Sequence, residues 1–408
     1  MTKVNILLFV AAAFLLKPAP TFGQYTDWKH SGSLYILTTP DGADLPASAQ
    51  VKDFPLLVRL DKDWFDFRQA RPKGQDVRFS TANGESMSYQ IEEWDPVAGE
   101  ASIWVRAPMI QGNTSQEIKM HWGRVGVESG SDGTAVFSAS NGYITVWHLN
   151  GTSKDSTGTL AGTDSGTTSA PGVIGLARRF PGGKGFDCGK SVTALPQGSS
   201  SHSTEAWARA VRPNGRVVGW GVEHKQGKVT MFFASPPHVR MDCYFSDANV
   251  KSNGRLPIGE WVHLMHTYSK GKARVYVNGQ LDGENKRRGT ALNIQSPGRM
   301  YIGGWYHNYD FVGDLDEVRV SSVQRSADWI KLQYENQKQR QSAIGSLVQP
   351  GAAFATSHQK ITMDEGAQVT VSAQAGGAQK VSWILKQNGE ETVVAVDRFR
   401  FTFDAGRV

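Results

Sequence analysis

The sequence predicts an all-β fold made of antiparallel β-sandwich domains. Two observations favour it: short runs in which apolar and polar side chains alternate, and turn-forming residues that separate these runs at short intervals. Long amphipathic patterns typical of helices are nearly absent. The chain has 408 residues, 39% hydrophobic and 20% charged, a composition typical of soluble proteins with packed cores that excludes disordered and fibrous classes. From this length we expect roughly two or three domains.

Residues 1–23 have the organisation of a secretory signal peptide. Lys3 supplies a positive start, the stretch 6–16 is apolar, and Thr21 and Gly23 offer small side chains at the two positions that a signal peptidase reads. A membrane anchor is the alternative, but the apolar stretch is shorter than the about 20 residues that span a bilayer. We expect cleavage before Gln24 and a protein that is secreted, periplasmic or displayed at the cell surface.

The cysteine count and the charge restrict the partners. Only Cys188 and Cys243 are present, which excludes a disulfide-dense scaffold but permits one bridge between them in an oxidising compartment; two buried free thiols are the alternative. The net charge of +6 and the basic run 286–288 come without any nucleic-acid-binding motif, so we expect no nucleic-acid partner. We also expect no membrane span within 24–408, because no segment there is long and apolar enough.

The first predicted unit spans residues 24–138. Its strands alternate apolar and polar side chains, and residues such as Asn83-Gly84 form turns between them. The predicted strands are 54–60, 76–79, 87–91 and 101–106. These runs, with the sequence Ile-Glu-Glu-Trp-Asp-Pro at 91–96, resemble a bacterial domain of unknown function, of the 2341 type, that is common in exported proteins. The resemblance implies location rather than chemistry, and it implies a laminin-G-like domain as neighbour.

The second predicted unit spans residues 141–347. A strand, an Asn278-Gly279 turn and a returning strand predict a hairpin, and Ser326 is placed to cap a helix over 327–334. Several ordered motifs resemble the laminin-G-like family of concanavalin A-like jelly rolls. They are Trp147-His148-Leu149, Phe180-Pro181-Gly182-Gly183, 203–209, 260–264, 273–280, 301–304 and 311–320. The resemblance implies a two-sheet jelly roll with one short helix near its C-terminal end.

Residues 352–408 begin a third predicted unit. The stretches 368–371 and 381–385 alternate apolar and polar side chains, and Asn388-Gly389 turns the chain between strands. The unit resembles an immunoglobulin-like sandwich. Because such a fold takes about 100 residues and 7 strands, we expect this one to be incomplete.

Catalytic motifs are absent from the sequence. It contains no G-x-S-x-G elbow, no H-E-x-x-H zinc motif, no complete phosphate loop and no Glu-x-Asp-x-x-Glu strand of the kind typical of concanavalin-like glycosidases. His263 and His266 cannot share a metal ion on one strand, because residues three apart point to opposite faces. We therefore expect no enzymatic activity, and a glycoside-active enzyme with two acidic residues on one face is the alternative.

Two aspartates are candidate metal ligands. Strand alternation puts Asp316 on the same face as Val318 and Val320, the expected core face, where a carboxylate needs partners. It could accept backbone N–H bonds, pair with an arginine or bind Ca²⁺. In jelly rolls that resemble this one, an aspartate of the closing strand and one in the loop matching Asp155 help to hold a structural calcium ion. Calcium is thus a candidate cofactor, with a hydrogen-bonded structural carboxylate as the alternative.

An aromatic loop is the candidate ligand-binding site. Trp305, Tyr306, His307 and Tyr309 lie between two predicted strands, in a segment too polar and irregular to be a strand itself. Flat rings stack on sugar faces while neighbouring polar atoms bond hydroxyl groups, so solvent-exposed rings here would indicate a carbohydrate site. The alternative is a packed loop in which Trp305 covers the edge of the sandwich.

Together these observations favour an extracellular, non-catalytic binding module. Its jelly roll would recognise a polysaccharide or a glycoprotein. The alternative is a structural or adhesive spacer within a larger exported or membrane-associated protein, because jelly rolls of this type serve lectins, enzymes and scaffolds alike.

Overall fold

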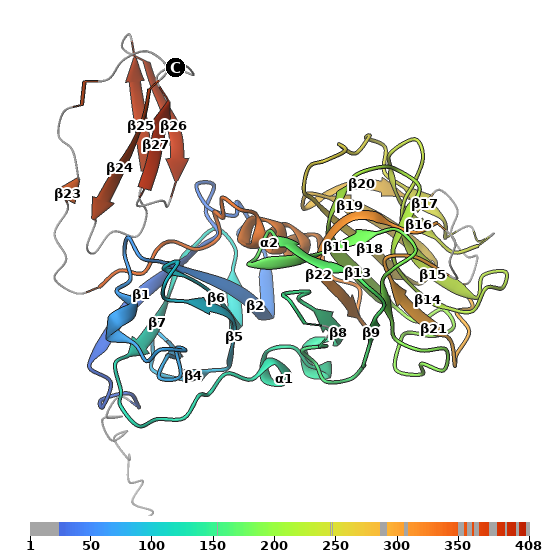
Figure 1. Ribbon diagram of the computed structural model, residues 1–408, viewed down its shortest axis with the longest axis horizontal. Coiled ribbons are helices and arrows are strands. Elements are labelled where there is room, and N and C mark those ends of the chain that lie inside the picture. The colour runs from blue at the N-terminus through green and yellow to red at the C-terminus, as the bar shows by residue number, and fades with distance from the viewer. Residues whose placement is uncertain are drawn as a thin grey trace, which may run out of the picture.

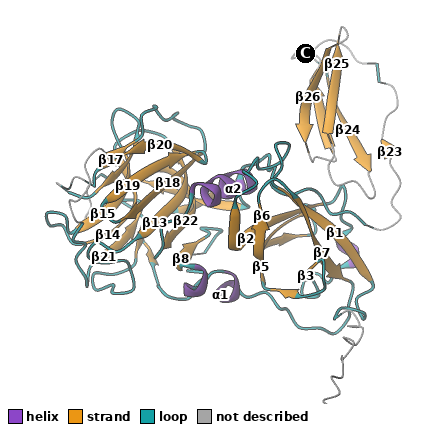
Figure 2. Ribbon diagram, turned by 180° about the vertical axis from the view of Figure 1, so that it is seen from behind, coloured by secondary structure: helices purple, strands orange, loops and turns teal. Residues whose placement is uncertain are grey.

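The computed structural model describes residues 24–152, 154–244, 246, 248–285, 292–305 and 309–349, and the shorter segments 355–356, 361–362, 367–374, 382–387, 390–396 and 400–404. Within them the fold is all-β, as predicted, and two short α-helices accompany the strands (Figures 1 and 2). The predicted signal peptide and two loop residues, Tyr306 and His307, lie outside the described residues. None of the helices in the described segments is long and apolar enough to cross a membrane.

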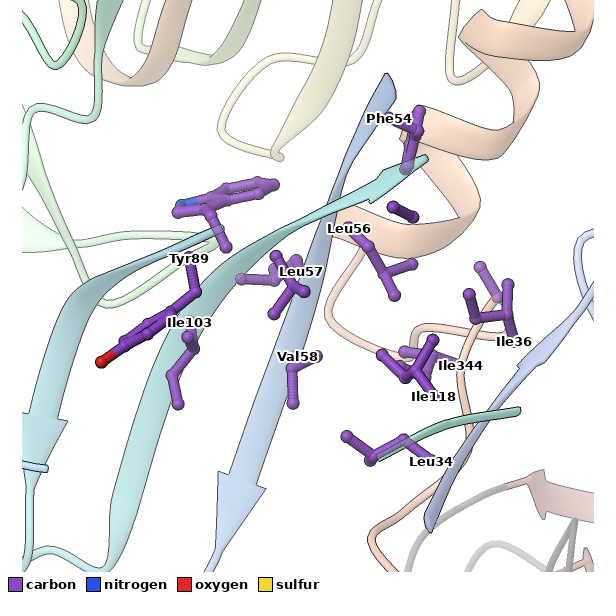
Figure 3. Packing of buried hydrophobic residues seen from close by; sticks show 14 of the residues in the cluster. Leu34, Ile36, Phe54, Leu56, Leu57, Val58, Tyr89, Ile103, Ile118 and Ile344 are labelled. Carbon is purple, nitrogen blue, oxygen red and sulfur yellow. The ribbon is translucent and has the colours of Figure 1, made fainter. Parts of the chain in front are cut away.

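The first unit arranges two antiparallel sheets around one core. The sheet orders are β1-β7-β3-β4 and β2-β6-β5. The elements are β1 (His30–Leu37), β2 (Gln50–Asp61), η1 (Phe67–Gln69), β3 (Arg78–Thr81), β4 (Ser86–Met87), β5 (Tyr89–Asp95), β6 (Glu100–Gln111), β7 (Ser115–Trp122), α1 (Gly133–Val136) and η2 (Ala139–Asn141). Figure 3 shows how Ile36, Val58, Ile103 and Ile118, from four different strands, converge on this core.

The second unit is a jelly roll of two antiparallel sheets. The eight-stranded sheet has the order β10-β11-β22-β13-β18-β19-β20, with β8 also paired to β22, and the seven-stranded sheet has the order β17-β16-β15-β14-β21-β12-β9. The strands are β8 (Tyr143–Trp147), β9 (Thr163–Asp164), β10 (Thr168–Pro171), β11 (Leu176–Pro181), β12 (Phe186–Asp187), β13 (His202–Ala210), β14 (Gly215–Gly221), β15 (Lys228–Phe233), β16 (Val239–Asp242), β17 (Val250–Lys251), β18 (Val262–Ser269), β19 (Lys272–Val277), β20 (Gln280–Glu284), β21 (Arg299–Ile302) and β22 (Val312–Ser321). The predicted hairpin joins β19 to β20 through Asn278 and Gly279, which both have positive φ, as a tight turn of this kind requires.

Helix α2 (Ala327–Gln337) lies between the first unit and the jelly roll (Figures 1 and 2). Its start is as predicted: the Ser326 hydroxyl accepts a hydrogen bond from the backbone N–H of Trp329 at 3.1 Å. The Trp329 ring meets Phe54 of β2 edge to face, with ring centroids 5.0 Å apart. The helix therefore buries one side against the first unit.

The free edge of β2 is satisfied by one side chain of α2. Asn336 accepts from the backbone N–H of Leu57 at 2.7 Å and donates to the carbonyl of the same residue at 3.0 Å. On an edge strand, alternate residues point these groups away from the sheet, so the amide of Asn336 takes the place of a neighbouring strand. Arg59 of β2 donates to the backbone carbonyls of Asn336 and Gln337, which lie among the orphan acceptors at the end of the helix.

The chain after α2 returns to the first unit. Ile344 and Val348 form backbone bridges to Ile36 and Ser33 of β1, and the side chains of Ile344 and Leu347 belong to the first unit's core. Figure 3 shows Ile344 beside Ile118 and Ile36. The core of the first unit thus includes residues from the jelly-roll segment, whereas the jelly roll has a second core between its own two sheets.

A β-bulge in β22 changes the direction of the acidic side chains. The pairing of β13 with β22 shifts between Glu205 and Trp207, and Glu317 has a φ of +52° at this point. Val318 faces the jelly-roll core, whereas Asp316 and Glu317 lie on the opposite face, toward the first unit. The predicted placement of Asp316 on the core face is therefore wrong, because the extra residue interrupts the alternation on which the prediction depended.

The third unit has two small sheets. Their orders are β23-β24-β27 and β25-β26. The strands are β23 (Ala355–Thr356), β24 (Gln368–Gln374), β25 (Ser382–Gln387), β26 (Glu390–Val396) and β27 (Arg400–Asp404). Trp383 stacks on Phe401 across the sheets, with ring centroids 6.0 Å apart. This packing is that of a small sandwich, and its immunoglobulin-like character stays a prediction.

The contact between Asn336 and Leu57 can be tested by mutation. Asn336→Ala leaves the N–H and C=O of Leu57 buried without partners, so we expect the free energy of unfolding to fall by about 2 to 4 kcal/mol. Urea denaturation measures this loss. Lys331→Ala on the same helix is the matched control; it removes an exposed ion pair with Asp44 and should change the free energy by less than about 1 kcal/mol. Equal effects of the two substitutions would contradict the role given to Asn336.

Two core histidines predict a pH dependence of stability. His202 and His266 face each other inside the jelly roll, whereas His263 lies on the opposite face of β18 beside Glu205, as the alternation predicts. Burial lowers the pKa of His202 to about 4 and that of His266 well below its ordinary value. The unfolded chain therefore binds more protons than the folded one below pH about 6.5, and stability falls as the pH drops toward 4.

Substitution of His202 isolates its share of this effect. His202→Phe keeps a flat ring between Trp220 and Tyr268 but cannot take up a proton. We expect it to remove roughly 3 kcal/mol of the loss in unfolding free energy between pH 6.5 and 4. Urea titrations at both pH values measure this, with the exposed His224→Gln as the control. An unchanged pH profile in His202→Phe would refute the prediction.

Candidate functional site

The outer face of the seven-stranded sheet gathers polar and aromatic side chains. In β15 and β16, Val229, Met231, Val239 and Met241 point into the jelly-roll core, so the residues between them point outward. The outward set, which we call the outer-face site, comprises Arg216, Lys228, Thr230, Phe232, Arg240 and Asp242, together with Trp305 and Tyr309 from the segment after β21.

Arg216 is the centre of the outer-face site. Its guanidinium donates to Asp242 and to Thr230, each at 2.8 Å. The same group lies 5.0 Å from the centroid of Phe232 and 4.9 Å from that of Tyr309, and the two rings contact each other edge to face with centroids 5.4 Å apart. Arginine contacts with aromatic faces of this kind are attractive and fix the planes of both partners. The Tyr309 ring is thereby held in one orientation.

The backbone of Tyr309 supports the same orientation. Its φ is +55°, a left-handed conformation that is uncommon for a residue other than glycine. Its carbonyl accepts a hydrogen bond from the N–H of Arg216 at 2.7 Å, which helps to hold this backbone geometry. Tyr309 is 43% exposed, so it remains accessible to solvent although its ring contacts Arg216 and Phe232.

A second cation completes the outer-face site. The ammonium of Lys228 bonds both carboxylate oxygens of Glu223 at 2.8 Å and lies 5.1 Å from the ring centroid of Tyr244 and 5.4 Å from that of Trp305. Burial lowers the pKa of Lys228, while its bond to Glu223 acts in the opposite direction. Tyr244, 37% exposed, is a second accessible ring on this face.

The aromatic residues of the predicted loop differ in their exposure to solvent. Trp305 is 1% exposed and donates its indole N–H to Glu223. Its ring lies over Gly219, where an added Cβ would come within 3.2 Å of it. Trp305 therefore cannot serve as a stacking platform, and of the predicted aromatic residues within the described part of the chain, Tyr309 is the exposed one. Arg216, Phe232 and Tyr244 were not identified as site residues from the sequence. For Phe232 a signal existed, because the alternation over 228–233 puts every second side chain of β15 on this face.

The two aspartates predicted to bind calcium are bonded to protein donors. Asp155 accepts from the backbone N–H groups of Val146, Thr157 and Leu160 and from the Thr157 hydroxyl, at 2.8 to 3.0 Å. Asp316 accepts from the N–H groups of Val173 and Ile174 at 2.8 and 3.1 Å. A Ca²⁺ ion needs 6 to 8 oxygen ligands, and calcium binding at these aspartates stays a prediction. Both contacts match the alternative of a hydrogen-bonded structural carboxylate.

The disulfide permitted by the sequence is not formed, and both cysteines are free thiols. Cys188 follows β12 and Cys243 follows β16, and three strands, β21, β14 and β15, lie between them in the sheet. Strands are spaced by about 4.8 Å, so these positions are roughly 19 Å apart along the sheet. A disulfide requires Cα atoms within about 7 Å. The prediction failed because sequence cannot show this strand order.

Both thiols should resist modification in the folded protein. Burial raises the pKa of Cys188 to about 12 and that of Cys243 well above its ordinary value, and the thiolate is the reactive form. We expect slow alkylation by iodoacetamide in native buffer and rapid alkylation in denaturant. Peptide mapping without reductant should recover the two cysteines in separate peptides. A linked peptide from folded, oxidised protein would contradict the strand order.

The comparisons with known families agree with this architecture. Residues 181–331 match the model of the concanavalin A-like lectin/glucanases superfamily, and residues 73–150 match that of a domain of unknown function, DUF2341. The chain therefore carries a concanavalin A-like jelly-roll domain preceded by a member of this uncharacterised family, as predicted. No curated protein matches the chain.

Several solved structures share weak likeness with the chain. Domain 4 of an extracellular arabinanase from Geobacillus stearothermophilus, in complex with arabinotriose, is 17% identical at a TM-score of 0.39, covering 47% of this chain and 97% of its own. A heptameric SAP-like pentraxin from Limulus polyphemus is 18% identical at a TM-score of 0.28, covering 38% and 79%. The CBM40 of a Ruminococcus gnavus sialidase, bound to alpha2,3 sialyllactose, is 11% identical at a TM-score of 0.32, covering 47% and 98%. Likenesses this weak imply nothing about the ligand of this chain.

Proposed function

We propose that this protein is an extracellular, non-catalytic binding module whose jelly roll recognises carbohydrate, free or on a glycoprotein, through the outer-face site. The observation that carries the proposal is the exposed ring of Tyr309, held against the guanidinium of Arg216. A ring whose orientation is fixed before binding loses little conformational entropy when a sugar stacks on it. The exposed ring of Tyr244 gives the same face a second apolar contact.

The polar groups of the outer-face site complement the rings. Sugar hydroxyl groups require donors and acceptors that are already oriented, and Glu223, Arg240 and the Tyr309 hydroxyl are side chains of this kind at the accessible rim. The cations Arg216, Arg240 and Lys228 face the carboxylates of Asp242 and Glu223, so one positive charge is left over, and a neutral or weakly acidic sugar chain fits this balance.

Binding is favoured over glycoside cleavage by the state of the acidic groups. Glycosidases place two carboxylates about 5 to 9.5 Å apart around the scissile bond, and one of them transfers a proton. On the outer-face site Asp242 is held by Arg216 and Arg240, and Glu223 is held by Lys228. Both carboxylates are therefore already engaged by side chains of the site itself.

A structural spacer is the second candidate function. It is favoured by one observation, the shared core of the first unit and the jelly roll, which makes the two a single stiff body. A spacer needs no ligand, so the two candidates differ in what the outer-face site does.

A glycan array probed with the purified chain, together with melting curves, separates these candidates. Tyr309→Ala should weaken binding by about 1 to 3 kcal/mol and leave the melting temperature nearly unchanged, because an exposed ring contributes to binding rather than to the core. Trp305→Ala should instead destabilise the fold by about 3 to 5 kcal/mol, because its ring is buried.

The control is Leu281→Ala, which removes an exposed apolar side chain, 53% accessible, from the other sheet of the jelly roll. It should change neither binding nor melting. If the parent protein binds neither neutral nor uronic glycans, or if Tyr309→Ala binds as the parent does, the outer-face site is not a sugar site and the spacer function is favoured.

A further inference from the structure

Three potential metal ligands converge where the first unit meets the jelly roll. They are Glu92 of β5, His148 directly after β8 and Glu317 at the bulge of β22, and their ligand atoms all lie within 4.8 Å of one another. The Nδ1 atom of His148 is 2.7 Å from Oε1 of Glu317 and 3.3 Å from Oε2 of Glu92. The three side chains are at most 8% exposed. We call this group the interface triad.

The histidine of the interface triad is oriented by a neighbour. Its Nε2 lies 3.3 Å from Oε1 of Gln90, whose own amide nitrogen donates to Ser156. Because a carbonyl oxygen only accepts, Nε2 must carry the hydrogen. In the neutral ring Nδ1 is then the atom with a free electron pair, and it faces the two carboxylates. A second hydrogen bond that sets the tautomer in this way is typical of metal-binding histidines.

The carboxylates of Glu92 and Glu317 are also oriented by hydrogen bonds from residues outside the interface triad. Arg319 donates its Nε and Nη2 atoms to Oε2 of Glu317, which leaves Oε1 directed at His148. Glu92 accepts from the indole N–H of Trp104 at 2.5 Å and lies 3.4 Å from the Asn150 amide nitrogen. Each member of the interface triad thus has a fixed orientation that does not depend on the other two.

Arg319 provides one positive charge beside the interface triad, whereas three carboxylates, those of Glu92, Glu317 and Asp316, lie buried there. With its hydrogen on Nε2, the neutral His148 ring has no hydrogen on Nδ1 to donate to either carboxylate. Next to the bulge, the carboxylate of Asp316 is fully buried as well. Buried carboxylates in this number need a counter-charge, and a divalent cation would provide one.

We propose that Glu92, His148 and Glu317 bind a divalent transition-metal ion that joins the first unit to the jelly roll. One imidazole nitrogen with two carboxylate oxygens suits Zn²⁺ and similar ions, whereas Ca²⁺ takes oxygen ligands in larger number. The burial of all three side chains makes the ion structural. Because the ligands come from both units, binding stabilises the interface, and it does so independently of any sugar at the outer-face site.

The test uses the full chain without an affinity tag, stripped of metal by a chelator. Calorimetric titration with Zn²⁺ should show about one ion per chain, and the melting temperature should rise with Zn²⁺ by mass action but not with Ca²⁺. His148→Gln should abolish both effects. Glu92→Gln, which is nearly isosteric and removes one buried charge, should weaken Zn²⁺ binding by at least about tenfold while the metal-free protein stays folded.

The matched control is His263→Gln. His263 is also a buried histidine bonded to a buried glutamate, Glu205 at 3.1 Å, but it belongs to no group of three ligands within the described residues. The variant should keep the Zn²⁺ response of the parent. A parent protein that binds no Zn²⁺, or one whose Zn²⁺ response persists in both His148→Gln and Glu92→Gln, would overturn the proposal. In either case the interface triad would be an ion network centred on Arg319.

Discussion

The architecture depends on the contact between helix α2 and the edge of β2. Asn336 satisfies both backbone groups of Leu57, and Arg59 binds the carbonyls at the end of the helix. A helix end and a sheet edge each leave unpaired backbone groups that are costly to bury, and here each supplies the partners of the other. Helix α2 can therefore be buried between the first unit and the jelly roll, and the two units pack against each other.

Much of this fold follows from local sequence patterns. The Asn278-Gly279 turn, the Ser326 cap and the alternating strands were predictable because each depends on residues close together in the chain. The two families could be inferred from ordered motifs, and the matches at 73–150 and 181–331 confirm them. Local patterns do not show which element packs against which face. Helix α2 is an example: its N-terminal cap is formed by a neighbouring residue, whereas Asn336 bonds Leu57, which is far away in the sequence.

The failures have the same origin. Alternation placed Asp316 on the core face, and one extra residue at Glu317 reversed its direction. Two cysteines in one domain suggested a bridge, but the sheet order separates Cys188 from Cys243 by three strands. For the candidate site, the sequence located the segment that holds Trp305 and Tyr309 but not which ring is exposed, because exposure depends on Gly219 and on the strands beneath. Bulges, strand order and the burial of a side chain depend on residues far apart in the chain, so they cannot be predicted from local patterns in one sequence.

The shared interface also decides which face of the jelly roll can meet a ligand. In the centre of the eight-stranded sheet, the outward side chains of Trp207 and Glu205 bond Gln337 of α2, and Arg319 lies 4.4 Å from the ring centroid of Trp104 in the first unit. That surface is occupied by the protein's own chain. On the seven-stranded sheet, Tyr309 and Tyr244 are 43% and 37% exposed. A ligand that stacks on aromatic rings therefore has the outer-face site available to it, whereas the centre of the eight-stranded sheet is already covered by α2 and the first unit.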